Sequence, residues 1–94
     1  MYATLRSYPG PETFADELVR HRDDVRNVIQ GIAGFRAYYL VKTSTGGAVS
    51  ISIFDDEAGA SESTERAAEW VRANLPDLGV QPPQVTSGEV VIEL

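Results

Sequence analysis

Apolar and polar residues alternate along four segments of the chain, at residues 2–7, 34–41, 49–54 and 85–94. Strict alternation is typical of strands, because successive side chains of a strand point to opposite faces of the sheet. Two longer segments, 12–32 and 57–75, instead carry their apolar residues on one helical stripe. The pattern therefore predicts the order strand, helix, strand, strand, helix, strand.

Turn and cap residues mark the boundaries of these elements. The segment Tyr8–Pro11 contains two prolines and a glycine and ends the first strand. Thr43–Gly47 joins the two middle strands as a hairpin. Asp55 and Asp56 are suited to cap the second helix, and Pro76 stops it. This order is typical of a ferredoxin-like α+β domain with an antiparallel sheet, and we interpret residues 1–94 as a single domain.

The alternation divides the strand residues into two faces of different character. We expect the more apolar face to lie under the two helices; its members are Ala3, Leu5, Phe35, Ala37, Tyr39, Val41, Val49, Ile51, Ile53, Val90, Ile92 and Leu94. The other face mixes polar and apolar residues, namely Thr4, Arg6, Arg36, Tyr38, Leu40, Ser50, Ser52, Phe54, Val91 and Glu93. Such a mixture fits either the lining of a small-molecule cavity or a partly solvated sheet face.

Composition and charge limit the function classes. The net charge is −6, with a pI near 4.6, so binding to nucleic acid or to an anionic membrane surface is disfavoured. The absence of cysteine excludes disulfides, thiolate metal sites and a cysteine nucleophile. We see no secretory signal and no apolar run near the roughly 20 residues that span a bilayer. We therefore expect a cytoplasmic protein.

Several segments of the chain together resemble the dimeric α+β barrel superfamily, and within it the antibiotic-biosynthesis-monooxygenase-like domains. The segments that carry the resemblance are residues 2–6, 34–41, 49–56, 67–72 and 88–92, which read YATLR, GFRAYYLV, VSISIFDD, AAEWVR and GEVVI. The resemblance implies a homodimer in which two ferredoxin-like protomers pack sheet against sheet and enclose a cavity. Members of this family include cofactor-independent oxygenases acting on aromatic polyketides, and haem-degrading enzymes.

A cofactor-independent oxygenase must bind a flat phenolic substrate and stabilise its anion in a site poor in water. On the mixed face, Arg6 and Tyr38 are our candidate catalytic residues, because both can stabilise a phenolate. The candidate ligand-binding residues are hydroxyls that can orient ring oxygens and rings that can stack, namely Thr4, Ser50, Ser52, Phe54 and Trp70. In the alternative interpretation, Arg6 pairs with Glu89 or Glu93 on the last strand, and the aromatic residues only pack.

The sequence predicts neither a metal site nor a cofactor. His21 is the only histidine, and we interpret it as a surface or boundary residue of the first helix. Haem-degrading relatives ligate iron through a helical histidine, and the helix at 57–75 has none, which counts against haem. Asp23–Asp24 is more typical of a solvated helix face than of a metal motif.

Three function classes follow. The first is a cofactor-independent monooxygenase acting on an aromatic or polyketide-like small molecule, working as a homodimer. The second is a non-catalytic small-ligand-binding or accessory dimer that uses the same cavity, favoured by the absence of histidine, cysteine or an acid/base pair on the mixed face. The third is a monomeric ferredoxin-like module that binds protein or nucleic acid, which the acidic charge disfavours in the case of nucleic acid.

Overall fold

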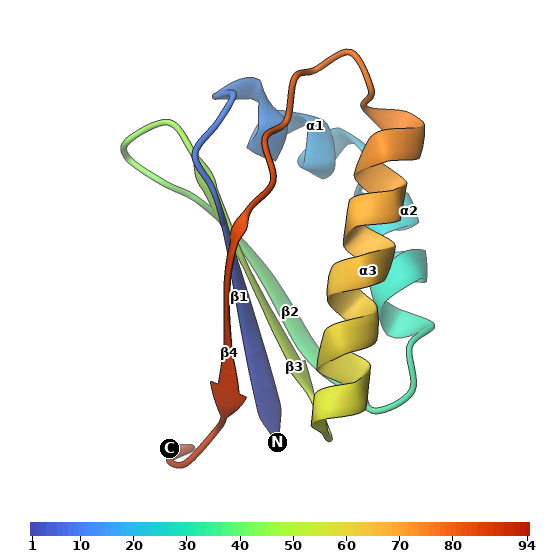
Figure 1. The fold of residues 1–94 in the computed structure, drawn as a ribbon, viewed down its shortest axis with the longest axis vertical. Helices are drawn as coiled ribbons and strands as arrows, with labels where there is room; N and C mark the ends of the chain where they lie inside the picture. Colours follow the sequence, from blue (N-terminus) through green and yellow to red (C-terminus); the bar gives the residue numbers. More distant parts are fainter.

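A computed structural model describes residues 1–94 and shows one antiparallel sheet with helices on a single side (Figure 1). The elements are β1 (Tyr2–Tyr8), α1 (Thr13–Arg20), α2 (Arg22–Gln30), β2 (Phe35–Lys42), β3 (Ala48–Phe54), α3 (Glu57–Asn74) and β4 (Gln84–Glu89). The strand order is β2-β3-β1-β4, and all neighbouring strands are antiparallel. The predicted ferredoxin-like α+β fold is confirmed.

Local sequence signals account for several of the element boundaries. The Asp56 side chain caps α3 by accepting a hydrogen bond from the Gly59 N–H at 3.1 Å. Gly46 has a φ of +93°, in the left-handed region that favours glycine, as the tight hairpin between β2 and β3 requires. The helix α3 ends at Asn74, two residues before Pro76.

Two elements differ from the sequence-based expectation. The helix predicted over 12–32 is two helices that meet at His21, whose ψ of 29° departs from helical geometry. No proline or glycine occurs at this junction, so the sequence does not mark it. The last strand ends at Glu89 instead of continuing to residue 94, although the Val90 N–H still donates to the Met1 carbonyl at 2.9 Å.

The helices cover the mixed face of the sheet, so the expectation that they cover the more apolar face is wrong. Arg6 is 1% exposed, whereas its neighbour Leu5, which points to the opposite face, is 40% exposed. Along β3, Ser50 and Ser52 are buried, whereas the alternate residue Ile51 is only half-buried. The inner face can be polar because α3 supplies hydroxyl groups that satisfy it, as described below.

A β-bulge moves one residue from the expected face to the other. The register of β2 against β3 shifts between Phe35 and Ala37, so Phe35 pairs with Phe54 on the inner face. Their rings are 5.9 Å apart and nearly perpendicular. Phe54 is fully buried there, with Ile29, Ile32 and Ala60.

The opposite face of the sheet, which we call the outer face, has no helix over it (Figure 1). Its centre is formed by register neighbours, with Leu5 and Tyr39 on either side of Ile51. Tyr39 is 60% exposed, and the apolar side chains of the tail after β4 are also exposed. A contiguous apolar face of this kind marks an interaction surface. No helix combines the length and apolar character that crossing a bilayer requires.

Candidate functional site

The centre of the candidate site is the guanidinium of Arg6, which β1 directs toward α3. Its Nε donates to the Ser50 hydroxyl at 3.0 Å, and its Nη2 donates to the Ser52 hydroxyl at 2.7 Å. Its Nη1 donates to the hydroxyls of Ser63 and Thr64 at 3.1 and 3.2 Å. Strand β3 and helix α3 thus hold the guanidinium from two sides.

No carboxylate balances this buried charge. None of the six ion pairs in the structure includes Arg6. The alternative pairing with Glu89 or Glu93 is therefore wrong; Glu89 pairs in register with Tyr2, and Glu93 lies beyond the end of β4. Buried charges in proteins are normally paired with an opposite charge. A guanidinium held only by neutral hydroxyls leaves a positive potential that favours an anionic ligand.

The two α3 hydroxyls are functional candidates that the sequence analysis missed. Ser63 and Thr64 follow Ala60 by three and four residues, on the small inward stripe of α3. The Ser63 hydroxyl also donates to the Ala60 carbonyl at 2.7 Å, which satisfies its proton and leaves its oxygen to accept from Arg6. The sequence did contain a sign of this role, since two neighbouring hydroxyl residues lie on the inward face of α3, where the other side chains are small.

Arg6 lies at a narrow cavity between the sheet and the helices, which we call the inner slot. Its polar members are Arg6 and Ser50, and its aromatic members include Tyr38 and Trp70; apolar side chains of the three helices complete it. The centre of a water molecule reaches only about 30 Å³ of the slot. This space holds about two water molecules, so a flat ring enters the slot only when the lining side chains move apart.

A wider outer groove adjoins the inner slot along α1, α2 and the free edge of β2. The slot and the groove share Leu18, Val25, Ile29 and Tyr38 in their linings. The centre of a water molecule reaches about 600 Å³ of the groove, within the usual range of about 300–1,000 Å³ for small-molecule sites. The groove can therefore hold most of a small molecule beside the entrance to the slot.

Tyr38 lies where the two cavities meet, and its environment keeps its hydroxyl protonated. Burial raises the pKa of Tyr38, and the positive charge of Arg6 only partly opposes this. The pKa of Tyr8, which also lines the slot, is raised by burial in the same way. Both side chains are therefore neutral phenols near pH 7, suited to donating a hydrogen bond and not to removing a proton.

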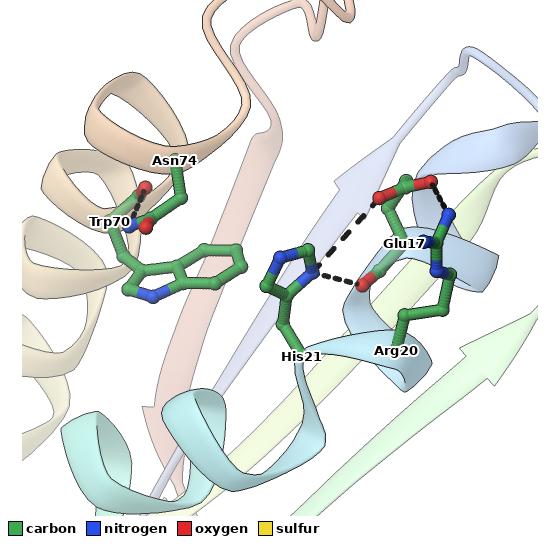
Figure 2. A network of polar contacts seen from close by, with 5 residues as sticks. All are labelled: Glu17, Arg20, His21, Trp70 and Asn74. Carbon is green, nitrogen blue, oxygen red and sulfur yellow. Dashed lines mark hydrogen bonds and ion pairs between the residues drawn. The ribbon is translucent and has the colours of Figure 1, made fainter.

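Trp70 lines the slot from α3 and contacts His21 across the helices (Figure 2). The two rings are 5.4 Å apart in an edge-to-face arrangement. The His21 Nδ1 lies 2.8 Å from the Glu17 carbonyl oxygen, which fixes the imidazole at the junction of α1 and α2. This contact joins that junction to α3 beside the slot.

His21 is half-buried and does not line the slot, which agrees with its interpretation as a boundary residue. The only histidine is thus not placed to ligate a haem iron in the slot, and the side chains here do not fit a histidine-ligated haem. No group of three or more histidine, aspartate and glutamate side chains is arranged to bind a metal ion.

The structure brings some of the predicted site residues together and separates others. Arg6, Tyr38, Ser50 and Trp70 line one slot, and Ser52 contacts Arg6 from behind it. Thr4 does not line the slot; its hydroxyl lies 3.3 Å from that of Ser87 on β4. Phe54 likewise packs in the apolar core and does not reach the slot. The cavity also lies within one protomer, beneath its own helices, and not between two sheets as the sequence interpretation implied.

Comparison with known proteins identifies the fold. Neither a protein-family model nor a curated protein sequence matches the chain. Solved structures do match it along its whole length. A protein of unknown function from Nitrosomonas europaea, NE2512, matches with a TM-score of 0.75 and 19% identity, over 99% of this chain and 91% of that one.

Two further matches have described activities. The haem-degrader MhuD from Mycobacterium tuberculosis, with two haems in its active site, matches with a TM-score of 0.73 and 12% identity, over 100% of this chain and 99% of that one. The ActVA-Orf6 monooxygenase of Streptomyces coelicolor, in complex with nanaomycin D, matches with a TM-score of 0.67 and 16% identity, over 98% and 92%. This chain has the fold of the antibiotic-biosynthesis-monooxygenase-like proteins. At these identities the likeness concerns the fold, and the activity must be argued from the site.

Proposed function

We propose that the protein is a cofactor-independent monooxygenase that oxidises a phenolic, aromatic or polyketide-like small molecule. The observation that carries the proposal is the Arg6 guanidinium, buried without a carboxylate at an aromatic-lined slot. Two fold neighbours support it, because one is a monooxygenase holding nanaomycin D and another degrades haem.

In the proposed reaction the bound phenol or enol loses a proton to solvent, and its anion transfers an electron to dioxygen. The resulting radical and superoxide combine to form a carbon–oxygen bond. The peroxide then loses water and leaves a quinone. For an anthrone, one dioxygen supplies one oxygen atom to the quinone and one to water, so atoms and electrons balance with dioxygen as the only oxidant.

Each slot residue has a role that its chemistry allows. Arg6 stabilises the substrate anion, since a preorganised buried cation acts strongly on developing charge in a site poor in water. Tyr38 donates a hydrogen bond to the anionic oxygen, because its raised pKa keeps it protonated. Trp70 stacks on the ring, and Ser50 orients Arg6 through its hydrogen bond to Nε.

We propose that two copies associate through their outer faces. Leu5, Tyr39 and Val41 leave the outer face apolar and exposed, and no helix of the chain covers it. A sheet-to-sheet dimer buries such faces together. Each protomer then keeps its own slot, since the slot lies on the helix side of the sheet. The outer groove borders this interface, because Tyr39 and Val41 also line the groove.

Oxygen uptake with anthrone and with a naphthohydroquinone tests the activity. We expect uptake by the wild-type protein, and its loss in the folded Arg6→Gln and Tyr38→Phe variants. The Arg66→Gln variant is the matched control, because Arg66 lies on α3 outside the slot and pairs with Glu62. Uptake that is equal in all four proteins would refute the assigned roles.

One observation favours a second function, a non-catalytic ligand-binding protein. The slot lining contains no histidine, aspartate, glutamate or cysteine, so it offers no evident general base. Saturable binding of the same aromatics, with no oxygen consumed by the wild-type protein, would select this function over the oxygenase.

A further inference from the structure

The outer groove has a charge pattern that the oxygenase proposal does not use. Arg22 and Arg26 line it from α2, four residues apart and therefore on one helix face. Arg22 forms no ion pair, and Arg26 lies 3.5 Å from Asp23, whose side chain is 84% exposed. An ion pair this exposed contributes little and is easily exchanged.

Apart from Gln30, the rest of the groove is apolar, and it contains no acidic residue. Nine of its twelve lining residues are hydrophobic, and none is aspartate or glutamate, although the chain carries a net charge of −6. Two arginines beside an apolar floor, in an acidic protein, complement a molecule with a flat apolar body and an acidic end.

We propose that the outer groove binds the carboxylate end of an aromatic acid whose phenolic ring lies in the inner slot. The inference rests on the proposed function and narrows its substrate class to aromatic or polyketide-like carboxylic acids. Arg6 faces the phenolic oxygen, and Arg22 and Arg26 face the carboxylate. The shared lining at Tyr38 allows one molecule to reach both cavities, with its bulk in the wider groove and one ring pushed between the side chains of the slot.

Trp70 provides the readout, because it is the only tryptophan and lines the slot. Quenching of its fluorescence by anthraquinone-2-carboxylate is compared with quenching by 2-(hydroxymethyl)anthraquinone, which has the same rings and no charge. We expect the acid to bind about 3- to 10-fold more tightly, the gain typical of two exposed ion pairs. The preference shrinks as salt is raised.

Variants assign the preference to the groove. In Arg22→Gln/Arg26→Gln the acid should bind no better than the alcohol, while the affinity for the alcohol is unchanged. The matched control is Arg20→Gln/Arg66→Gln, which removes the same number of positive charges. Arg20 and Arg66 lie outside both cavities, and each pairs with a glutamate. The control should keep the preference for the acid.

The outcomes separate this inference from the proposed function. Equal binding of acid and alcohol by the wild type, or an unchanged preference in Arg22→Gln/Arg26→Gln, overturns the carboxylate assignment and leaves an aromatic slot intact. Absence of quenching by either compound overturns both proposals. If neither compound quenches Trp70 and Arg22→Glu also weakens self-association, the groove contacts a second copy of the chain and does not bind a ligand.

Discussion

The hydrogen bonds of Arg6 predict that removing the Ser50 and Ser52 hydroxyls destabilises the wild-type protein but stabilises an Arg6→Met variant. The Arg6→Met substitution removes the buried charge and replaces it with an apolar side chain that adapts to irregular space. Ser50 and Ser52 then lose the donor that they face at 3.0 and 2.7 Å. Ser63 still has the Ala60 carbonyl as a partner.

The magnitudes follow from this accounting of hydrogen bonds. A hydrogen bond to a charged group contributes about 1.5–3 kcal/mol, so Ser50→Ala/Ser52→Ala should cost about 3–6 kcal/mol when Arg6 is present. A buried hydroxyl without a partner costs about 1–3 kcal/mol, so the same two substitutions should stabilise the Arg6→Met variant by about 1 kcal/mol or more. Replacing a polar cluster entirely by apolar groups is often neutral or stabilising. The triple variant Arg6→Met/Ser50→Ala/Ser52→Ala should therefore be more stable than Arg6→Met alone.

The four proteins to compare are the wild type, Arg6→Met, Ser50→Ala/Ser52→Ala and the triple variant. Urea denaturation, followed by far-ultraviolet circular dichroism and by Trp70 fluorescence, measures their free energies of unfolding. The protein concentration is kept constant, because self-association would make the stability depend on it. A change of 1 kcal/mol shifts the Tm of a domain this size by about 4–8 °C, so both effects are measurable. If Ser50→Ala/Ser52→Ala has the same sign with arginine and in the Arg6→Met background, the guanidinium does not organise these hydroxyls and the reasoning fails.

Three further predictions concern packing, pH and association. Gly59→Ala should destabilise by about 1–3 kcal/mol despite better helix propensity, because the new Cβ would lie 2.9 Å from both the Ala33 carbonyl oxygen and a Phe54 ring carbon. Thermal melts measure this loss beside Ser61→Ala, an exposed position on the same helix where the change should be neutral or slightly stabilising. A Gly59→Ala variant as stable as Ser61→Ala would contradict the close packing. Burial raises the pKa of Tyr38 in the folded state above its ordinary value of about 10, so its contribution to stability is present below about pH 10 and is lost as pH rises through the folded-state pKa. Tyr38→Phe should therefore lose less stability than wild type as the pH is raised above about 10, and parallel losses would contradict this. Ile51→Lys on the outer face should convert the proposed dimer to a folded monomer in native mass spectrometry, whereas an unchanged mass would exclude that face as the interface.

Apart from Phe35 and the residues after Glu89, the chain's alternation defined the two sheet faces correctly, but it did not say which one the helices cover. An apolar face is buried wherever a partner surface is available, and that partner can be a helix of the same chain or another molecule. Leu5 and Ile51 belong to the face without helices, and Arg6 and Ser52 to the face beneath them. Only the packing of α3, whose Ser63 and Thr64 accept from Arg6, settled the choice.

The candidate site was partly accessible from the sequence. Arg6, Tyr38 and Ser50 were correctly placed on one face, because residues two apart on a strand share a side and antiparallel partners align. Thr4 and Phe54 shared that face yet lie away from the slot, since distance along a strand separates them from Arg6. Ser63 and Thr64 were missed, because a helix position becomes a contact only when the helix docks.

The sequence by itself determined the order of the elements, the turns, the α3 cap at Asp56 and most of the membership of the two sheet faces, because short-range sterics and local hydrogen bonds act within a few residues. The tertiary structure alone decided that α1 and α2 break at His21, that a bulge turns Phe35 inward, and that Arg6 is buried among four hydroxyls without a carboxylate. These features depend on groups far apart in the chain, such as Arg6 and Thr64, whose free energies of interaction exist only once strand and helix are packed together.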